Sequence, residues 1–336
     1  MSSLVRAAIG SCFPTSGLTQ LFPPNSTFVP DRDIGDLADQ TIAVTGFNSG
    51  IGFEVTRQLM LHNTGHLLLI ARSPERARDA IENLKKLVPQ STSKIEFVEA
   101  DLSDLESVRR AGEDIVKRQF KINVLFNNAG VASTPKDQLT KQGLDMQWGS
   151  NVVGPFLLTK ILRPCLEAGA NNSGQRSRIV NTSSYLHQNA APTPTGIDFD
   201  TFQGGPKRDA AVQKLPNTPI AGLYGQSKLG NIFISDEFAE WNPNLIHSCA
   251  VHPGIIRSNL MSHGPKTTVA KVFEWLSFGP EYGALPLLYP GLVKSLDMNR
   301  KYYIPWAREG AVSKQAKDKN TQRAVIEWIE NFVKDY

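Results

Sequence analysis

The chain has 336 residues, of which 40% are hydrophobic and 20% charged, and its formal net charge is +4. This length suits one large α/β domain or two ordinary ones, with enough apolar content for a full core. Lys and Arg are scattered among Asp and Glu, so the chain lacks the basic run that marks a nucleic-acid-binding protein. We therefore expect a small anionic ligand and no polyanion as partner.

The three cysteines, Cys12, Cys165 and Cys249, lie far apart, and their spacing predicts neither a metal site nor a disulfide framework. No apolar run approaches the roughly 18–20 residues that a membrane-spanning helix needs. The first residues, MSSLVRAAIGSCF, make a poor signal peptide because their apolar stretch is short and broken. We expect a cytoplasmic protein without an integral membrane segment.

Residues 1–37 are rich in Pro, Ser, Thr and Gly. This composition predicts an extended N-terminal arm over the body of the protein, with disorder as the alternative. Such an arm would either cover the sheet edge or make a weak contact with a membrane surface. The remaining residues, 38–336, are expected to form a single domain.

Within 38–336, short apolar runs alternate with longer amphipathic segments. The apolar runs predict buried strands at 41–46, 66–71, 95–100, 122–127, 178–183 and 246–251, with a weaker candidate at 301–305. Helical patterns lie at 51–62, 74–88, 103–119, 138–169, 223–241 and 320–334. Strict alternation predicts a doubly wound α/β fold, with a mainly seven-stranded parallel sheet and helices on both faces.

The stretch TGFNSGIG, at 45–52, follows the first predicted strand and opens the first predicted helix. Gly46 allows a tight turn, Gly50 lets a pyrophosphate approach the backbone, and Gly52 permits close packing of helix on strand. The helix N-terminus offers free N–H groups and a partial positive charge to phosphates. In this context the turn predicts a dinucleotide site, whose residues are Thr45, Gly46, Asn48, Ser49, Gly50, Ile51 and Gly52.

Tyr224 and Lys228 stand four residues apart in GLYGQSKLGN, at 222–231, so on a helix they share one face. The spacing alone fits either a surface pair or a proton donor with a cation beside it. A nearby ammonium lowers the pKa of a phenol from its usual value of about 10 toward the range useful for acid–base catalysis.

Further motifs, in this order, resemble those of the classical short-chain dehydrogenase/reductase family over about residues 38–335. They are the T-G-x-x-x-G-I-G turn, Asp101–Leu102, NNAG at 127–130, Asn151 in SNVVGPF, Ser184 in NTSS, YGQSK, and HPGIIRS at 252–258. The resemblance implies a Rossmann-type fold and an oxidoreductase that uses a nicotinamide cofactor. It also favours the catalytic interpretation of the Tyr224–Lys228 pair.

The resemblance implies roles for single residues. Tyr224 would exchange the substrate proton, Ser184 would hold and polarise the substrate oxygen, and Lys228 would lower the pKa of Tyr224 and bind the nicotinamide ribose. Asn151 would fix a water that links Lys228 to bulk solvent. Cofactor contacts are also implied for Asp101, Leu102, Asn128, Ala129, Gly130, Pro253, Gly254, Ile256 and Ser258. Tyr185 and His187, which follow Ser184, are expected in the pocket wall.

The end of the second predicted strand bears on the choice of cofactor. An NAD site usually places a carboxylate there for the ribose 2′-hydroxyl, whereas this chain has Ala71 followed by Arg72. An arginine grips a 2′-phosphate bidentately, so NADP(H) is expected, with Ser73 as a further contact. The alternative is that Arg72 is a solvated charge at the strand end.

Ser184 and Tyr224 are separated by a long Pro-, Gly- and Asn-rich connection at 186–221, where a short loop would be expected. Long loops in compact domains are usually functional or mobile. Similar insertions occur in the retinol-dehydrogenase-like branch, which the chain also resembles in SNVVGPFLLTK, SKLGNIF and HPGIIRSNL.

Residues 259–282 follow the nicotinamide loop, and in the family this region forms the substrate lid. Its apolar residues, among them Leu260, Met261 and Phe273, indicate a hydrophobic carbonyl or alcohol as substrate. The alternative is an amphipathic helix that packs on the core.

Two other function classes stay open. The first is reduction of an activated C=C bond, or of another specialised-metabolite intermediate, on the same scaffold. The second is a non-catalytic NADP(H) sensor, against which the intact set of Asn151, Ser184, Tyr224 and Lys228 argues. We expect a monomer or a homodimer, because the insertion lies close to the surface through which family members often dimerise.

Overall fold

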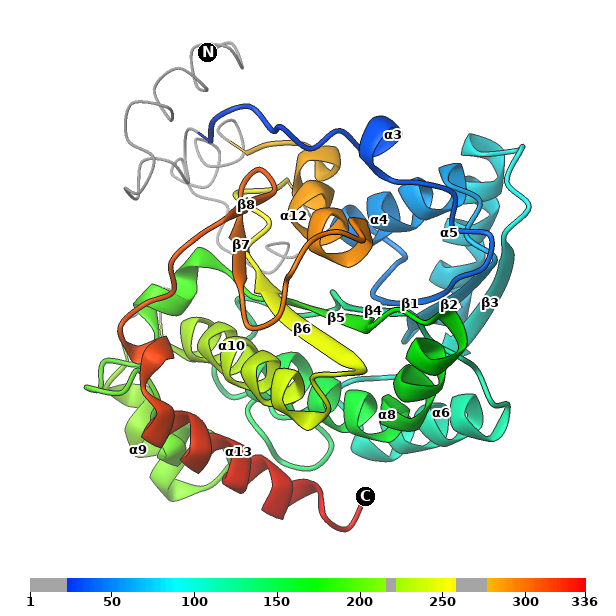
Figure 1. Ribbon diagram of the computed structural model, residues 1–336. Helices are drawn as coiled ribbons and strands as arrows, with labels where there is room; N and C mark the ends of the chain where they lie inside the picture. The colour runs from blue at the N-terminus through cyan, green and yellow to red at the C-terminus, as the bar shows by residue number, and fades with distance from the viewer. Residues whose placement is uncertain (1–22, 216–221, 258–276) are drawn as a thin grey trace.

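An eight-stranded sheet forms the centre of the computed structural model, which describes residues 23–215, 222–257 and 277–336 (Figure 1). Its strands are β1 (Thr41–Thr45), β2 (His66–Ala71), β3 (Lys94–Glu99), β4 (Val124–Asn127), β5 (Ser177–Thr182), β6 (Ile246–Val251), β7 (Tyr302–Ile304) and β8 (Arg308–Glu309). They follow the order β3-β2-β1-β4-β5-β6-β7-β8. All neighbours through β7 are parallel, and β8 pairs antiparallel with β7. The predicted α/β fold with a mainly parallel sheet is confirmed, and β8 is a short antiparallel addition.

Helices cover both faces of this sheet (Figure 1). On one face lie α4 (Gly50–Leu61), α5 (Pro74–Leu87) and α12 (Pro280–Leu292), and on the other α6 (Leu105–Lys117), α8 (Gly154–Ser173) and α10 (Leu223–Trp241). Each face has its own hydrophobic cluster. The central strands are buried on both sides, which explains why β2 is a continuous apolar run without alternation. The C-terminal helix α13 (Lys319–Val333) packs on α10.

The helix predicted at 138–169 begins later than expected. Asp145 is its N-cap, and the Asp145 carboxylate accepts hydrogen bonds from the backbone N–H groups of Gln147 and Trp148 at 3.0 and 2.9 Å. From there α7 (Met146–Trp148), a π-helical turn η1 (Gly149–Val153) and α8 follow without a break. The prediction was wrong for residues 138–145, where Leu139 and Leu144 form isolated β-bridges.

The segment 186–221, described up to residue 215, contains regular structure that the sequence did not predict. It holds most of the 3₁₀ turn η2 (Tyr185–Asn189), a second 3₁₀ turn η3 (Phe199–Thr201) and helix α9 (Pro206–Gln213). Gln226 of α10 binds this segment through two hydrogen bonds. Its Nε2 donates to Thr201 Oγ1 at 2.5 Å, and its Oε1 accepts from the Asp198 N–H at 3.1 Å. The insertion therefore docks on the helix that carries Tyr224 and Lys228.

The insertion also contacts the start of α7. Arg208 Nη2 lies 2.8 Å from Asp145 Oδ2, and both side chains are buried. Phe202 stacks on Trp148 with ring centroids 3.8 Å apart. The insertion thus joins the helix that leads to Asn151 with the helix that carries Tyr224.

The described part of the expected arm, residues 23–37, packs onto the sheet face that α12 covers. It forms a short helix, α3 (Pro30–Asp33), and buries Phe28, Ile34 and Leu37 in the cluster of that face. The Phe28 ring lies 5.3 Å from that of Tyr289 in α12. Among helices in the described ranges, none is long and apolar enough to cross a membrane.

Candidate active site

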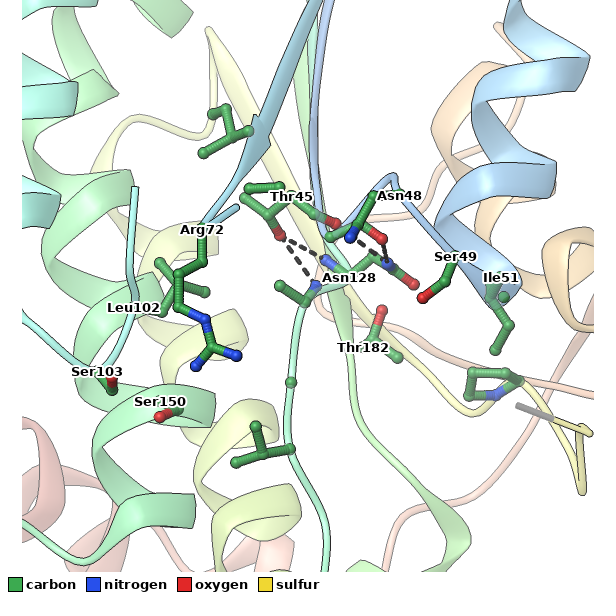
Figure 2. Close-up of a pocket in the computed structure, with 18 of the residues that line it drawn as sticks. Thr45, Asn48, Ser49, Ile51, Arg72, Leu102, Ser103, Asn128, Ser150 and Thr182 are labelled. Atoms are coloured by element: carbon green, nitrogen blue, oxygen red, sulfur yellow. Dashed lines mark hydrogen bonds between the residues drawn. The ribbon is translucent and has the colours of Figure 1, made fainter. Parts of the chain in front are cut away.

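A cavity of about 360 Å³ opens at the carboxyl edge of the sheet (Figure 2). It lies where β4 is the neighbour of β1 in the sheet and the strand order reverses. This is the place where open α/β sheets bind their ligands. Thr45 at the end of β1, Ala71 at the end of β2 and Thr182 at the end of β5 all line it.

The cavity collects most of the residues that the sequence assigned to the cofactor. These are Thr45, Gly46, Asn48, Ser49, Gly50, Ile51, Arg72, Asp101, Leu102, Asn128, Ala129, Gly130, Tyr224, Lys228, Pro253, Gly254 and Ile256. Gly52 does not line it but packs behind the turn, where an added Cβ would stand 2.3 Å from the Gly46 carbonyl oxygen. Ser258, Leu260, Met261 and Phe273 lie outside the described residues, so their predicted contacts stay predictions.

The glycine-rich turn and the NNAG segment hold each other in place. Thr45 Oγ1 accepts hydrogen bonds from the N–H groups of Asn128 and Ala129, each at 3.0 Å. In return, Asn128 Nδ2 donates to the carbonyl oxygens of Thr45 and Gly46 at 3.0 and 3.3 Å (Figure 2). Gly46 has a φ of +69°, which favours glycine at this position.

The donor groups of the cavity fit a dinucleotide. Helix α4 starts at the cavity, and its N-cap Ser49 makes no side-chain hydrogen bond within the described residues, so first-turn N–H groups stay available to an anion. The Thr182 hydroxyl, which is drawn in Figure 2, has no hydrogen-bond partner in the described part of the chain. Lys228 Nζ donates to the Thr182 carbonyl oxygen at 2.9 Å and keeps two further protons.

Two arginines line the cavity beside the end of β2. Arg72 precedes α5, and Arg76 lies in the first turn of that helix, where its N–H donates to the N-cap oxygen Ser73 Oγ at 3.3 Å. Asp101 is the one carboxylate on the cavity wall within the described ranges. Its Oδ1 already accepts from the N–H and hydroxyl of Ser103 at 2.9 and 2.7 Å.

The first turns of α10 place Tyr224 and Lys228 on the cavity, on one face of the helix as the spacing predicted. Both side chains are buried, and Lys228 Nζ lies 5.5 Å from the centroid of the Tyr224 ring. A side-chain hydrogen bond joins Tyr224 to Ser184, which caps the start of η2. The structure thus brings three of the four predicted catalytic side chains to one wall.

Burial, and not the neighbouring ammonium, dominates the titration of this pair. Burial raises the pKa of Tyr224 well above its usual value, and only the hydrogen bond with Ser184 acts in the opposite direction. Burial also lowers the pKa of Lys228 to about 7, because a buried ammonium loses its hydration. The expected lowering of the Tyr224 pKa by Lys228 was therefore wrong for this structure.

The fourth predicted catalytic residue, Asn151, lies in the π-helical turn η1, a form of backbone often found at functional sites. Its Oδ1 accepts from the Val131 N–H at 2.8 Å, and its Nδ2 donates to the Val131 carbonyl at 2.9 Å and to Ser227 Oγ at 3.0 Å. Asn151 thus connects the irregular segment after NNAG to α10, between Tyr224 and Lys228. It lies next to Gly130, where an added Cβ would stand 3.0 Å from Asn151 Oδ1 and 3.5 Å from Lys228 Nζ.

Comparison with known proteins decides the family. The family model for short chain dehydrogenases matches residues 40–195. A short-chain dehydrogenase/reductase of Armillaria gallica is 36% identical over 95% of this chain and 97% of the relative. The chain belongs to the short-chain dehydrogenase/reductase family. It is therefore an oxidoreductase of the NAD(P)(H)-dependent kind.

One further relative and two solved structures are also similar to this dehydrogenase/reductase. The chloroplastic short-chain dehydrogenase TIC 32 A of Brassica napus is 33% identical over 80% of this chain and 81% of the relative. The Pseudomonas aeruginosa RhlG/NADP active-site complex matches the fold with a TM-score of 0.61 and 20% identity, over 82% of this chain and 98% of that one. An NADPH-dependent 3-quinuclidinone reductase from Rhodotorula rubra matches with a TM-score of 0.57 and 16% identity, over 85% and 97%.

Tyr185 and His187 are not among the described residues that line the cavity of this dehydrogenase/reductase, and their contact with the substrate stays a prediction, since the expected lid lies largely outside the described residues. His187 is buried on the far side of Ser184, where its Nδ1 lies 2.7 Å from the Ser184 carbonyl oxygen. Both residues belong to the 3₁₀ turn η2, which begins directly after Ser184.

Several residues of the cavity wall were not found by sequence reasoning. They are Ile70, Ala71, Arg76, Ala100, Ser103, Val131, Met146, Ser150, Thr182, Ser183 and His252. For Arg76 a signal existed, because it lies one helical turn after Arg72 in ARSPERAR. Met146 and Ser150 gave none, since they reach the cavity only through the late start of their helix at Asp145.

Proposed function

We propose that this dehydrogenase/reductase transfers a hydride between NADP(H) and a hydrophobic carbonyl or alcohol, with Tyr224 as the general acid and base. The observation that carries the proposal is the joint placement of Tyr224, hydrogen-bonded to Ser184, and Lys228 on the wall of a cavity that begins at a glycine-rich turn. A positioned proton donor beside such a cavity is the minimal set for carbonyl reduction.

When bound, the nicotinamide cofactor supplies the hydride in the reducing direction and accepts it in the oxidising direction. The protein holds the substrate oxygen between the hydroxyls of Ser184 and Tyr224. Because burial raises its pKa, Tyr224 carries its proton at neutral pH and donates it to the carbonyl oxygen. Lys228, with a pKa of about 7, exchanges its own proton at the same pH and lies one turn away.

The preference for NADP(H) over NAD(H) rests on charge at the end of β2. Arg72 and Arg76 both line the cavity there, and no acidic residue takes the place next to Ala71 that a 2′-hydroxyl would require. Guanidinium groups bind phosphate by charge-assisted hydrogen bonds. Asp101 faces the cavity with its Oδ1 held by Ser103, which suits the adenine contact that the family resemblance implies.

We infer a hydrophobic substrate from the apolar residues in the sequence of 259–282. The retinol-dehydrogenase-like branch is supported by the insertion at 186–221 and by the likeness to TIC 32 A. The hydrophobic substrate and the assignment to this branch are both part of the proposal.

The test is to incubate the enzyme with NADPH or NADH and a panel of hydrophobic aldehydes, ketones and enones, and to identify the products by mass spectrometry and NMR. We expect alcohols from the carbonyls, formed faster with NADPH. Saturation of the enone C=C bond with the carbonyl left intact would favour the alternative reaction. Tight binding of NADPH without any product from the panel would contradict the proposal.

A further inference from the structure

The two ring nitrogens of His187 have partners that fix its tautomer. Nδ1 lies 2.7 Å from the carbonyl oxygen of Ser184 and 3.4 Å from the Tyr302 hydroxyl, and Nε2 lies 3.0 Å from the backbone nitrogen of Ser313. A carbonyl oxygen can only accept and an N–H can only donate. Nδ1 therefore carries the proton and Nε2 accepts, so the imidazole is neutral. Burial of the ring, which also lowers its pKa, disfavours the cation that would place a second proton against the Ser313 N–H.

The His187 bond closes the turn that orients Ser184. The Ser184 carbonyl oxygen accepts a second hydrogen bond, from the His187 backbone N–H at 3.1 Å. The Ser184 hydroxyl accepts from the Leu186 N–H at 3.2 Å and makes a further hydrogen bond with the Tyr224 side chain. One short 3₁₀ turn thus fixes both the backbone and the side-chain oxygen of Ser184, and the imidazole holds that turn at its first carbonyl.

The imidazole is itself held from the opposite side. Ser313 follows β8, and its own hydroxyl accepts from the Ala316 N–H at 3.2 Å at the start of the 3₁₀ turn η5 (Gln315–Lys317). The ring of Tyr302 in β7 meets the His187 ring edge-on with centroids 5.2 Å apart. His187 therefore bridges the carboxyl end of β5 to the C-terminal segment, although it does not line the cavity.

We propose that His187 is a positioning residue for the reaction. Through the Ser184 carbonyl it holds the Ser184 hydroxyl against Tyr224, and through Nε2 it links this geometry to Ser313. Its effect on turnover rests on the function proposed above, whereas its contacts with Ser184 and Ser313 do not. A displaced catalytic hydroxyl lowers turnover without changing how the cofactor binds, since His187 lies outside the cavity.

Two substitutions separate the two bonds. His187→Asn places an amide N–H where Nδ1–H lies, so it keeps the bond to Ser184 and loses the one to Ser313. His187→Gln places an amide oxygen where Nε2 lies, so it keeps the bond to Ser313 and loses the one to Ser184. His187→Phe fills the space and loses both. Comparing the three variants distinguishes orientation of Ser184 from simple packing.

We expect kcat of His187→Asn to stay within about threefold of the wild type, and kcat of His187→Gln and His187→Phe to fall about 10- to 100-fold. The dissociation constant for NADPH, measured by fluorescence, should not change in any variant. Equal kcat in the Asn and Gln variants, whether lowered or not, would overturn the positioning role.

A spectroscopic readout is independent of turnover. A long-range ¹H–¹⁵N spectrum of protein labelled in histidine should show the Nδ1–H tautomer of His187 at neutral pH, with the peak assigned by its loss in His187→Asn. An Nε2–H tautomer or a cation would contradict the contacts. If the wild type reduced no carbonyl, the proposed function would fail and with it the catalytic consequence, while this spectrum would still decide the contacts.

Discussion

Lys228 Nζ lies 5.5 Å from the centroid of the Tyr224 ring and donates to the Thr182 carbonyl oxygen at 2.9 Å. Both side chains are buried on the first turns of α10. Burial disfavours charge on each of them, so the pKa of the phenol rises while that of the amine falls to about 7. Tyr224 is therefore a proton donor that stays protonated, and Lys228 is an amine that exchanges its proton near neutral pH.

The burial of Lys228 predicts how stability depends on pH. Its pKa falls from 10.5 in the unfolded chain to about 7 in the folded one. Between these values the unfolded chain binds one more proton, so this group makes the free energy of unfolding rise with pH by up to about 1.4 kcal/mol per unit. Below about pH 7 both states are protonated, and the cost of burying the ammonium is fully present.

Lys228→Met should remove this rise and stabilise the protein below about pH 7 relative to the wild type. Urea unfolding of both proteins between about pH 6 and pH 10 measures it. Lys85→Met, at an exposed position of α5, is the matched control and should leave the slope of the wild type unchanged. An identical slope in Lys228→Met and the wild type would show that Lys228 is not the titrating group.

Arg72→Ala tests the choice of cofactor. One lost charge-assisted contact is worth roughly 1.5–3 kcal/mol, so the ratio of kcat/KM for NADPH over NADH should fall about 10- to 100-fold. Arg78→Ala is the control, because Arg78 is an exposed arginine on the following helix α5 and does not line the cavity. An unchanged ratio in Arg72→Ala would assign Arg72 to the solvated charge at the strand end.

The buried pair between Arg208 and Asp145 predicts a stability effect of the insertion. Arg208→Met leaves the Asp145 carboxylate buried without its partner and should lower the free energy of unfolding by about 3–5 kcal/mol. Adding Asp145→Asn should recover part of the loss, because asparagine still caps α7 but carries no charge.

Arg109→Met provides the comparison, since the ion pairs of Arg109 with Glu106 and Glu113 are solvent-exposed, and their loss should lower the free energy of unfolding far less than the loss of the buried pair. Denaturant unfolding gives all four values. If Arg208→Met lowers the free energy of unfolding no more than Arg109→Met does, the pair between Arg208 and Asp145 does not stabilise the docking of the insertion.

The strands and most helices could be predicted from the sequence because burial on both faces makes parallel strands continuous apolar runs. The helix expected at 223–241 has the observed bounds of α10. Helix α12 could not be predicted, since Pro286 and Pro290 lie inside it and break the local pattern. Its burial against β4 and β5 outweighs the missing hydrogen bonds, and that burial is visible only in three dimensions.

The candidate site could also be predicted only in part. The residues of the glycine-rich turn and the NNAG segment could be assigned to one cavity because local spacing fixes them at strand ends. The burial of His187 in the turn after Ser184 was not foreseen, and the expected lowering of the Tyr224 pKa was wrong because burial raises it. Neither property is encoded in a spacing. The α9 helix within the insertion likewise depends on contacts distant in sequence, such as that of Arg208 with Asp145.

The most direct test of the proposed mechanism compares the wild type with Tyr224→Phe, following NADPH consumption with the best carbonyl of the panel. The phenylalanine keeps the ring and removes the proton, so kcat should fall about 10²- to 10⁴-fold while NADPH still binds. Turnover that survives in Tyr224→Phe would contradict the assignment of Tyr224 as the general acid and base.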